Sequence, residues 1–327
     1  MAIATEALLP RNGLRRIDPA RFLLRLERAK PHPADGPPAR LEGVLADLDR
    51  RIQPFGRGFG APWAARRAHG LRGGFRWDAA DSRTEAWYPQ GIAASPDGAV
   101  VLVSWYHTAS GDARVSCVDL AAGAYRHMRL TTAAGKPVRT HAGGLAWRED
   151  LLYVTQTTAG LRVFDLAGIR RTAATGDERY VLPEVARYRP AGEALRFSFS
   201  SVDEAATGLL IGEYVDAAPG ARLIRWPFAP GGLLAQEAAS DGWVTAQSNL
   251  QGAVALEGRM LMAESRGARL PGRLHVSPYA ERVEQKRWAV GGEDLAVARG
   301  EILSLSEHPD FPRPLPRRRT VFRAAAP

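Results

Sequence analysis

Short apolar runs separated by small or polar turn residues make up most of this chain. Many of the runs alternate, as in Val115-Ser116-Cys117-Val118, where a polar residue stands between apolar neighbours. Alternation with a period of two residues is typical of a strand whose two faces pack differently. The chain also contains 33 glycines and 23 prolines, which favours many turns. We therefore expect an all-β fold.

Five segments share one pattern, a small or polar turn followed by an apolar strand. They are Gln90-Gly91-Ile92-Ala93, Gly143-Gly144-Leu145-Ala146, Ser200-Ser201-Val202-Asp203, Gln251-Gly252-Ala253-Val254 and Glu293-Asp294-Leu295-Ala296. The second residue of each segment, which we call the anchor, stands at position 91, 144, 201, 252 or 294. The gaps of 53, 57, 51 and 42 residues between anchors each suit one propeller blade. The repeat predicts a β-propeller.

A second feature keeps register with the anchors. The residues that end the strand following each inner turn, which we call the closing residues, are Trp105, Gln156, Glu213, Glu264 and Glu307. They lie 14, 12, 12, 12 and 13 residues beyond their anchors, and an alternating strand follows each one. Each unit therefore opens with a hairpin. The count predicts five blades, and a sixth stays open if one unit has diverged.

The two ends of the repeat set the expected domain boundaries. Only 33 residues follow Asp294, too few for four strands, so we expect the segment from Leu71 to Trp87 to supply outer strands and close the ring. Residues 71–327 would form the propeller. Residues 1–70 would form a helical extension, with one helix over Pro19 to Arg28 capped by Asp18 and a second from about Arg40 to Ile52.

Several of these motifs carry a family resemblance. With Trp87-Tyr88-Pro89-Gln90-Gly91, His141-Ala142-Gly143-Gly144-Leu145-Ala146-Trp147 and Gly292-Glu293-Asp294-Leu295, the chain resembles a family of actinobacterial proteins, many of them secreted. The resemblance spans roughly residues 73 to 324 and implies a propeller without implying an activity. More distantly, the inner strands look like those of gluconolactonase-type and strictosidine-synthase-type propellers.

The resemblance to lactonases raises the question of a metal. In that family Asn or Asp residues in the inner turns hold a divalent ion, together with a Glu near the N-terminus. Here the corresponding turns hold Gln90, Gly143, Ser200, Gln251 and Glu293. We expect no required cofactor, and a calcium or magnesium site stays as a lesser alternative because Glu293 and Asp294 could supply oxygen ligands.

The inner turns of a propeller converge on one mouth of the central channel, so residues there share a pocket although they are about fifty positions apart. His141 has an ordinary pKa near neutrality, and Glu293 and Asp294 form an acidic pair at the equivalent turn of the last unit. These three are the candidate catalytic residues. The candidate ligand-binding residues are Tyr88, Gln90, Trp105, Ser200 and Gln251.

Structural roles compete with these functional ones. Asp294 could cap the backbone amides of its own turn, and Trp105 could belong to the core. The closing residues Glu213, Glu264 and Glu307 are chemically alike, which favours a scaffold role in which they accept hydrogen bonds from a neighbouring blade. Because each lies twelve or more residues past its anchor, we expect these glutamates at the opposite mouth of the channel.

The leading functional hypothesis is a cofactor-independent enzyme that applies acid–base chemistry to a small molecule, as a cyclase, isomerase, lyase or lactone hydrolase, for example in natural-product biosynthesis. The alternative is a non-catalytic module that binds a sugar or a protein partner. The sequence contains no Gly-x-Ser-x-Gly elbow, no His-Glu-x-x-His helix and no phosphate-binding Gly-rich loop ending in Gly-Lys. Serine-hydrolase and nucleotide-dependent chemistry are therefore disfavoured.

Charge and composition restrict the partners further. The net charge is +9, but arginines are spread along the chain without a basic stripe interleaved with aromatics, so we do not expect nucleic-acid binding. The single cysteine, Cys117, lies in an apolar run and is expected to be buried. No apolar run is long enough to span a membrane. The stretch from Ala2 to Pro10 contains Glu6 and is a poor export signal, so we expect a cytoplasmic protein.

Overall fold

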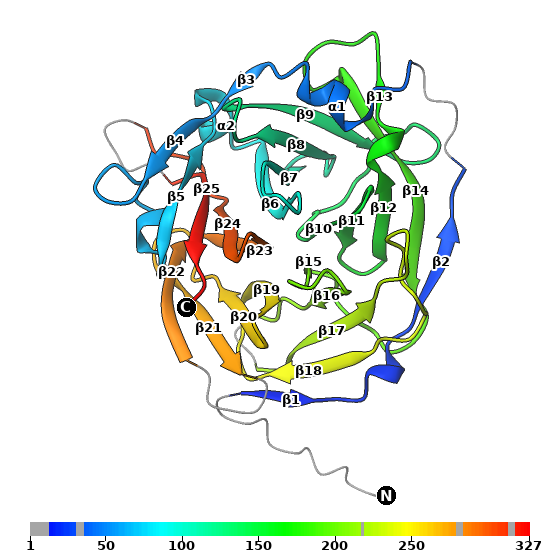
Figure 1. Ribbon diagram of the computed structural model, residues 1–327, viewed down its shortest axis with the longest axis vertical. Helices are drawn as coiled ribbons and strands as arrows, with labels where there is room; N and C mark the ends of the chain where they lie inside the picture. The colour runs from blue at the N-terminus through cyan, green and yellow to red at the C-terminus, as the bar shows by residue number, and fades with distance from the viewer. Residues whose placement is uncertain (1–12, 31–35, 217–218, 279–283, 313–317) are drawn as a thin grey trace, which may run out of the picture.

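The computed structural model describes residues 13–30, 36–216, 219–278, 284–312 and 318–327, and it is a propeller of antiparallel sheets around a central axis (Figure 1). The apolar stretch before residue 13 that bears on an export signal lies outside the described residues. Five strands lie nearest the axis, and we call them the inner strands. These inner strands are β6 (Trp87–Ala94), β10 (Leu145–Arg148), β15 (Phe199–Val202), β19 (Leu250–Leu256) and β23 (Gly292–Ala298).

Each inner strand begins a set of four antiparallel strands. The next three strands outward are β7 (Val100–His107), β8 (Ala113–Asp119) and β9 (Ala124–Thr131); β11 (Leu151–Gln156), β12 (Gly160–Asp165) and β14 (Tyr180–Pro190); β16 (Gly208–Gly212), β17 (Ala221–Pro227) and β18 (Asp241–Thr245); β20 (Arg259–Glu264), β21 (Pro271–Pro278) and β22 (Glu284–Val290); and β24 (Glu301–Ser306), β25 (Thr320–Ala325) and β5 (Leu71–Arg76). The predicted propeller and its hairpin units are confirmed.

The last set contains the ring closure. Strand β5 pairs with β25, with Phe75 opposite Val321 and Gly74 opposite Phe322, so an early segment of the chain supplies the outermost strand of the last inner-strand set. The pairing uses only the first part of the segment predicted for closure. After Arg76 the chain forms a short helix, α2 (Ala79–Arg83), before it enters β6.

The predicted helix over residues 19–28 is wrong. Asp18 does cap Pro19, since its carboxylate accepts the backbone N–H of Ala20, but the capped element is a single 3-10 turn, Pro19–Arg21. The chain then forms β2 (Leu24–Arg28), which pairs with the outer edge of β14. Its leucines are compatible with either a helix or a strand, and the unpaired backbone of β14 decides in favour of the strand.

The second predicted helix is also shorter than expected. Helix α1 covers only Arg40–Leu45, and the chain continues as strands β3 (Arg50–Arg51) and β4 (Gln53–Gly56). With β1 (Leu14–Arg16), which pairs with β18, and β13 (Arg170–Arg171), these strands lie along the outer edges of the propeller sheets. The N-terminal segment therefore covers strand edges that would otherwise be open to solvent.

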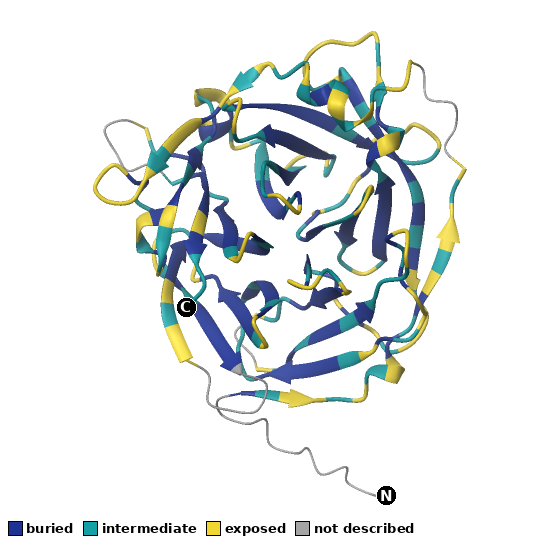
Figure 2. Ribbon diagram, viewed as in Figure 1, coloured by how far each residue is buried: buried dark blue, intermediate teal, exposed yellow. Residues whose placement is uncertain are grey.

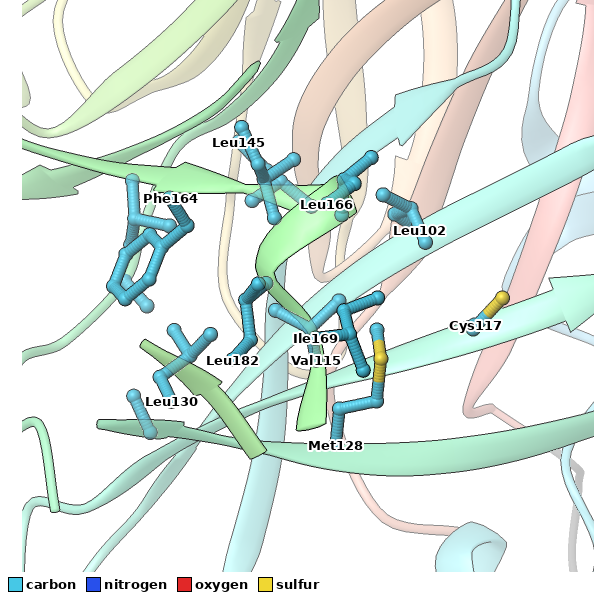
Figure 3. Packing of buried hydrophobic residues seen from close by; sticks show 14 of the residues in the cluster. Leu102, Val115, Cys117, Met128, Leu130, Leu145, Phe164, Leu166, Ile169 and Leu182 are labelled. Carbon is cyan, nitrogen blue, oxygen red and sulfur yellow. The ribbon is translucent and has the colours of Figure 1, made fainter. Parts of the chain in front are cut away.

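Apolar side chains fill the spaces between neighbouring sheets, and exposed residues concentrate in the loops and outer strands (Figure 2). Figure 3 shows the cluster between the sheets of β6 and β10, in which Leu102, Val115, Leu145 and Phe164 pack together. Cys117 lies in the same cluster and is fully buried, as predicted, and burial raises the pKa of its thiol.

The anchors lie where inner strands make close contact around the axis. A Cβ atom on Gly144 would come within 2.2 Å of the Ser200 nitrogen, and one on Gly91 within 2.7 Å of the Leu145 nitrogen. The Ser201 hydroxyl donates to the Ala253 carbonyl at 2.6 Å. Each of these anchors thus contacts the next inner strand, which explains why the repeat keeps small residues there.

Asp294 completes this ring of contacts. Its carboxylate accepts the backbone N–H groups of Leu145 at 3.1 Å, Ile92 at 3.3 Å and Leu295 at 3.0 Å, so one side chain joins three inner strands. Asp294 is fully buried, and burial raises its pKa while the three N–H groups oppose that rise. The capping role is observed and extends well beyond its own turn.

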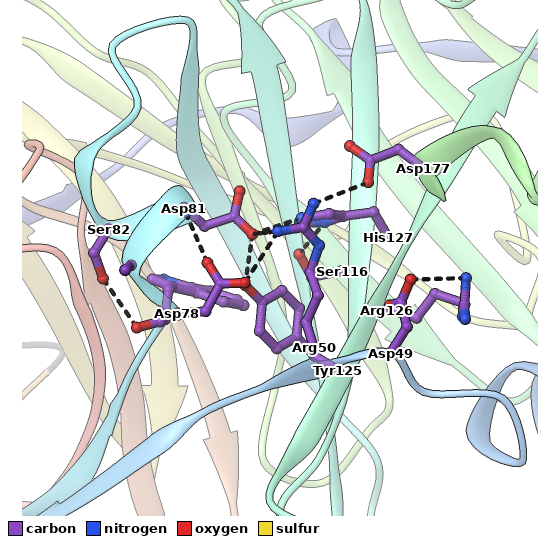
Figure 4. A network of polar contacts seen from close by, with 12 residues as sticks. Asp49, Arg50, Asp78, Asp81, Ser82, Ser116, Tyr125, Arg126, His127 and Asp177 are labelled. Carbon is purple, nitrogen blue, oxygen red and sulfur yellow. Dashed lines mark hydrogen bonds and ion pairs between the residues drawn. The ribbon is translucent and has the colours of Figure 1, made fainter. Parts of the chain in front are cut away.

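A buried polar network ties the N-terminal segment to the first sheet (Figure 4). The Asp81 carboxylate on α2 accepts from Arg114 at 2.8 Å, from the Tyr125 hydroxyl at 2.5 Å and from His127 Nε2 at 2.8 Å. Arg50 of β3 also reaches it at 3.4 Å. Burial opposes ionisation, but the contacts with His127 and Arg114 hold the pKa of Asp81 well below its ordinary value.

Candidate active site at the mouth of the propeller

A pocket of about 180 Å³ opens where the inner turns converge. Four of the residues predicted from the repeat line it, namely Gln90, His141, Gln251 and Glu293. They come from segments at or next to inner strands β6, β10, β19 and β23, so the strand register places side chains from distant parts of the sequence in one cavity. The remaining lining residues are Gly143, Thr157, Arg196, Ser198 and Tyr214.

Two carboxyl groups share a hydrogen bond at one wall of this pocket. Glu293 is buried and is hydrogen-bonded to Glu307. An amide flanks each of them: Gln251 Nε2 donates to Glu293 at 3.1 Å, and Gln90 Nε2 donates to Glu307 at 2.8 Å. The four side chains form a continuous chain of hydrogen bonds across the mouth. Two carboxyl groups in contact cannot both ionise easily, so the pair retains a proton.

The surroundings determine which carboxyl group holds that proton. Burial, and then the charge of Glu307, raise the pKa of Glu293 well above its ordinary value. Burial also raises the pKa of Glu307, but the Gln90 amide and the positive charge of Arg319 oppose this rise. The proton of the pair therefore resides mainly on Glu293, which is also the member that lines the pocket.

His141 stands in the same pocket in the opposite protonation state. Its ring lies against Tyr106, with 4.4 Å between ring centroids. Desolvation lowers the pKa of His141, and the charge of Arg196 lowers it further. The imidazole is therefore uncharged near neutral pH while Glu293 keeps its proton. An uncharged base and a protonated acid lining one cavity are the two groups that acid–base catalysis requires.

Glu307 corrects one prediction about the closing residues. Because β24 runs antiparallel to β23, with Ser306 opposite Gly292, a hairpin returns its closing residue to the mouth from which the anchor strand departs. The expectation of the opposite mouth was wrong because the residues between the anchor and the closing residue form two antiparallel strands, so the chain returns to the end from which it started. Glu307 consequently lies beside Glu293.

The other two closing glutamates have scaffold roles. Glu213 accepts hydrogen bonds from the Arg222 side chain at 2.6 and 2.7 Å and from the backbone N–H of Arg196 at 2.8 Å. Glu264 contacts His275 at 2.7 Å and Arg273 at 3.2 Å. Their side-chain partners come from the next strand of the same sheet rather than from a neighbouring blade.

Four predicted site residues lie outside the pocket lining. Trp105 is fully buried in the core, where its indole N–H donates to Ser116 at 2.7 Å, and Ser200 is fully buried at the axis. Asp294 joins inner strands, as described above, and is fully buried. The Tyr88 ring lies near Tyr106, with 6.1 Å between ring centroids. Ser200 and Asp294 lie outside the lining because the inner strands pack closely at the axis, and Trp105 because it belongs to the core between sheets.

Sequence reasoning missed several wall residues that nevertheless obey the repeat. Thr157 and Tyr214 each follow a closing residue by one position, and Ser198 precedes its anchor by three positions, as His141 does. The position after each closing residue was the signal that could have identified the first two. Arg196 lies in the segment before β15 and had no such signal.

Within the described ranges, no helix is long and apolar enough to cross a membrane. The same ranges contain no group of three or more His, Cys, Asp or Glu side chains placed to hold a metal ion.

Comparisons with known proteins add little to this geometry. No protein-family model matches the chain, and no curated protein matches its sequence. A GH43_1 enzyme from Xanthomonas citri is 13% identical, with 74% of this chain and 88% of that one covered and a TM-score of 0.42. TolB from Acinetobacter baumannii is 8% identical, with coverages of 87% and 68% and a TM-score of 0.38. The Dos1 propeller is 9% identical, with 68% of each chain covered and a TM-score of 0.33. The propeller assignment therefore rests on the strand pairing of this chain.

Proposed function

We propose that the mouth pocket is the active site of an enzyme that moves protons on a small organic molecule without a cofactor. The observation that carries the proposal is the pairing of opposite protonation states, with Glu293 protonated and His141 uncharged in the wall of one cavity. Environments that push the pKa values of two nearby groups apart are typical of acid–base sites.

In this proposal His141 takes a proton from a carbon or from a water molecule, and Glu293 gives its proton to an oxygen of the substrate. Glu307 and Gln251 hold the Glu293 carboxyl group in place on either side. The two transfers leave His141 charged and Glu293 ionised, and a return transfer to product or solvent restores both. Isomerisation, elimination, cyclisation and lactone hydrolysis all fit this exchange of two protons.

The carboxyl pair does not suit glycoside hydrolysis. Retaining and inverting glycosidases place their two carboxyl groups about 5 Å or more apart, because a sugar carbon or a water molecule must fit between them. Glu293 and Glu307 are hydrogen-bonded to each other and leave no such space. We therefore assign them jointly to a single acid function.

A non-catalytic role in sugar binding is the second candidate. Tyr214 lines the pocket with the amides of Gln90 and Gln251, and Tyr106 lies against the His141 ring. Aromatic rings with amide groups suit a sugar. This candidate requires no proton transfer, so Glu293→Gln would leave binding intact and there would be no turnover to lose.

The decisive experiment follows panels of small lactones, hydroxy acids and keto acids by proton NMR in D₂O. Loss of substrate or exchange of deuterium into carbon reports proton transfer directly. We expect wild-type activity to fall at least about a hundredfold in Glu293→Gln and in His141→Ala, the scale of one acid or base group. Glu301→Gln, which changes an exposed ion pair with Arg323, is the matched control. Undiminished turnover in either pocket variant would exclude the proposed mechanism.

A further inference from the structure

One arginine stands in the pocket wall. Arg196 is exposed at the mouth, and within the described part of the chain its guanidinium forms no ion pair. The guanidinium carbon lies 5.6 Å from the centroid of the Tyr214 ring. An arginine held over an aromatic ring keeps its donors free for a ligand.

The carboxylate that holds the Arg196 backbone is already occupied by another arginine. Glu213 accepts the backbone N–H of Arg196, but its oxygens also receive the side chain of Arg222 at 2.6 and 2.7 Å. Glu193 pairs with Arg222 as well, at 2.8 Å, and with Arg21 at 2.7 Å. This cluster fixes the backbone of Arg196 and leaves its guanidinium unneutralised.

The rest of the pocket does not supply the missing negative charge. Glu293 is the acidic residue among the lining side chains, and it holds the proton of the carboxyl pair. Gln251, Thr157 and Ser198 contribute uncharged polar groups. The lining side chains therefore offer hydrogen-bond donors and one fork-shaped cation, Arg196.

We propose that this pocket binds a small organic carboxylate, whose carboxyl group pairs with Arg196 while its remaining atoms lie toward His141 and Glu293. A guanidinium matches a carboxylate through two parallel hydrogen bonds. The cavity of about 180 Å³ is smaller than sites for drug-sized ligands, which hold roughly 300 Å³ or more, so the acid is small. A single arginine suits a monoanion better than phosphate. Where the inference names a substrate, it rests on the proposed function.

The test compares three acids with their uncharged amides: acetate with acetamide, lactate with lactamide, and pyruvate with pyruvamide. Saturation-transfer NMR on the full chain measures the affinity of each. We expect at least one acid to bind about tenfold or more tightly than its amide, as one charge-assisted contact provides. Arg196→Gln should remove that preference. Arg25→Gln makes the same change of charge on the exposed face of β2 and should keep it.

The outcomes separate this inference from the proposed function. Equal binding of acid and amide, no binding of any acid, unchanged binding in Arg196→Gln, or tighter binding of inorganic phosphate would each overturn the carboxylate site. Arg196-dependent acid binding without turnover would support the site and count against the enzyme. Turnover of neutral lactones by a protein that binds none of the acids would support the enzyme and overturn the site.

Discussion

The carboxyl group of Glu293 is hydrogen-bonded to that of Glu307, and the two lie at the open end of one hairpin, Glu293 in β23 and Glu307 directly after β24. The flanking amides of Gln251 and Gln90 satisfy the outer oxygens. This relationship explains how a carboxylic acid keeps a proton near neutral pH inside a pocket that also contains an uncharged histidine.

The carboxyl pair makes stability depend on pH. The folded state binds a proton that the unfolded chain releases above about pH 4.3, the ordinary value for Glu. The stability that this proton contributes is complete below that pH and is lost as pH rises through the raised pKa of Glu293. We expect Glu293→Gln to flatten the fall of Tm above pH 5, and Glu301→Gln to leave it unchanged. A parallel fall in all three proteins would contradict the assignment.

Asp294→Ala should destabilise the fold strongly. The substitution leaves the buried N–H groups of Leu145, Ile92 and Leu295 without their acceptor. Each buried unsatisfied group costs about 1 to 3 kcal/mol, so we expect the free energy of unfolding to fall by at least about 3 kcal/mol. Urea denaturation measures this, with Asp150→Ala on the surface as the control. A loss below about 1 kcal/mol would show that Asp294 does not join the inner strands.

Gly144→Ala should disrupt the contact between inner strands. The added methyl group would lie 2.2 Å from the Ser200 nitrogen, so β10 and β15 would have to separate. Overpacking of this kind costs about 1 to 3 kcal/mol or more. Gly56→Ala adds the same methyl group where no atom lies within 4 Å and should be nearly neutral. Equal Tm values for the two variants would rule out the close approach.

Arg196→Gln should raise the pKa of His141. Removing the positive charge lessens the penalty on the imidazolium, while the desolvated position stays unchanged. NMR titration of the His141 ring proton measures the change, and Arg25→Gln provides the reference. Any activity that requires uncharged His141 should then rise at a higher pH in Arg196→Gln than in the wild type. An unaltered titration would mean that Arg196 does not face His141.

The repeat predicted which residues share a pocket better than it predicted their individual positions in depth. Gln90, His141, Gln251 and Glu293 share a pocket because each stands at a fixed distance from an anchor, and the anchors contact one another around the axis. The spacing of a sequence repeat gives the strand register directly. Tyr106 and Tyr214 also stand at a fixed register, one position after a closing residue. This register points to the mouth only once the hairpins are known to return to the end from which they start.

Roles that depend on depth and partner choice were not predictable in this way. Asp294 and Ser200 occupy the same register as the pocket residues, yet the close approach of inner strands buries them. Residues 24–28 carry leucines that fit a helix or a strand, and only the free edge of β14 decides between them. The structural role of Trp105 depends on Ser116 and on the buried network around Asp81, which brings together distant segments.

The pairing of β5 with β25 also constrains the order in which the chain can fold. Phe75 is synthesised long before its partner Val321. The edge of β5 that pairs with β25 therefore stays unpaired until nearly the whole propeller has been synthesised. Closing so long a loop carries an entropic cost that local hairpins do not have. The hairpins can form as they appear, whereas completion of the ring is the late, slow event that converts a curved stack of sheets into a cooperative unit.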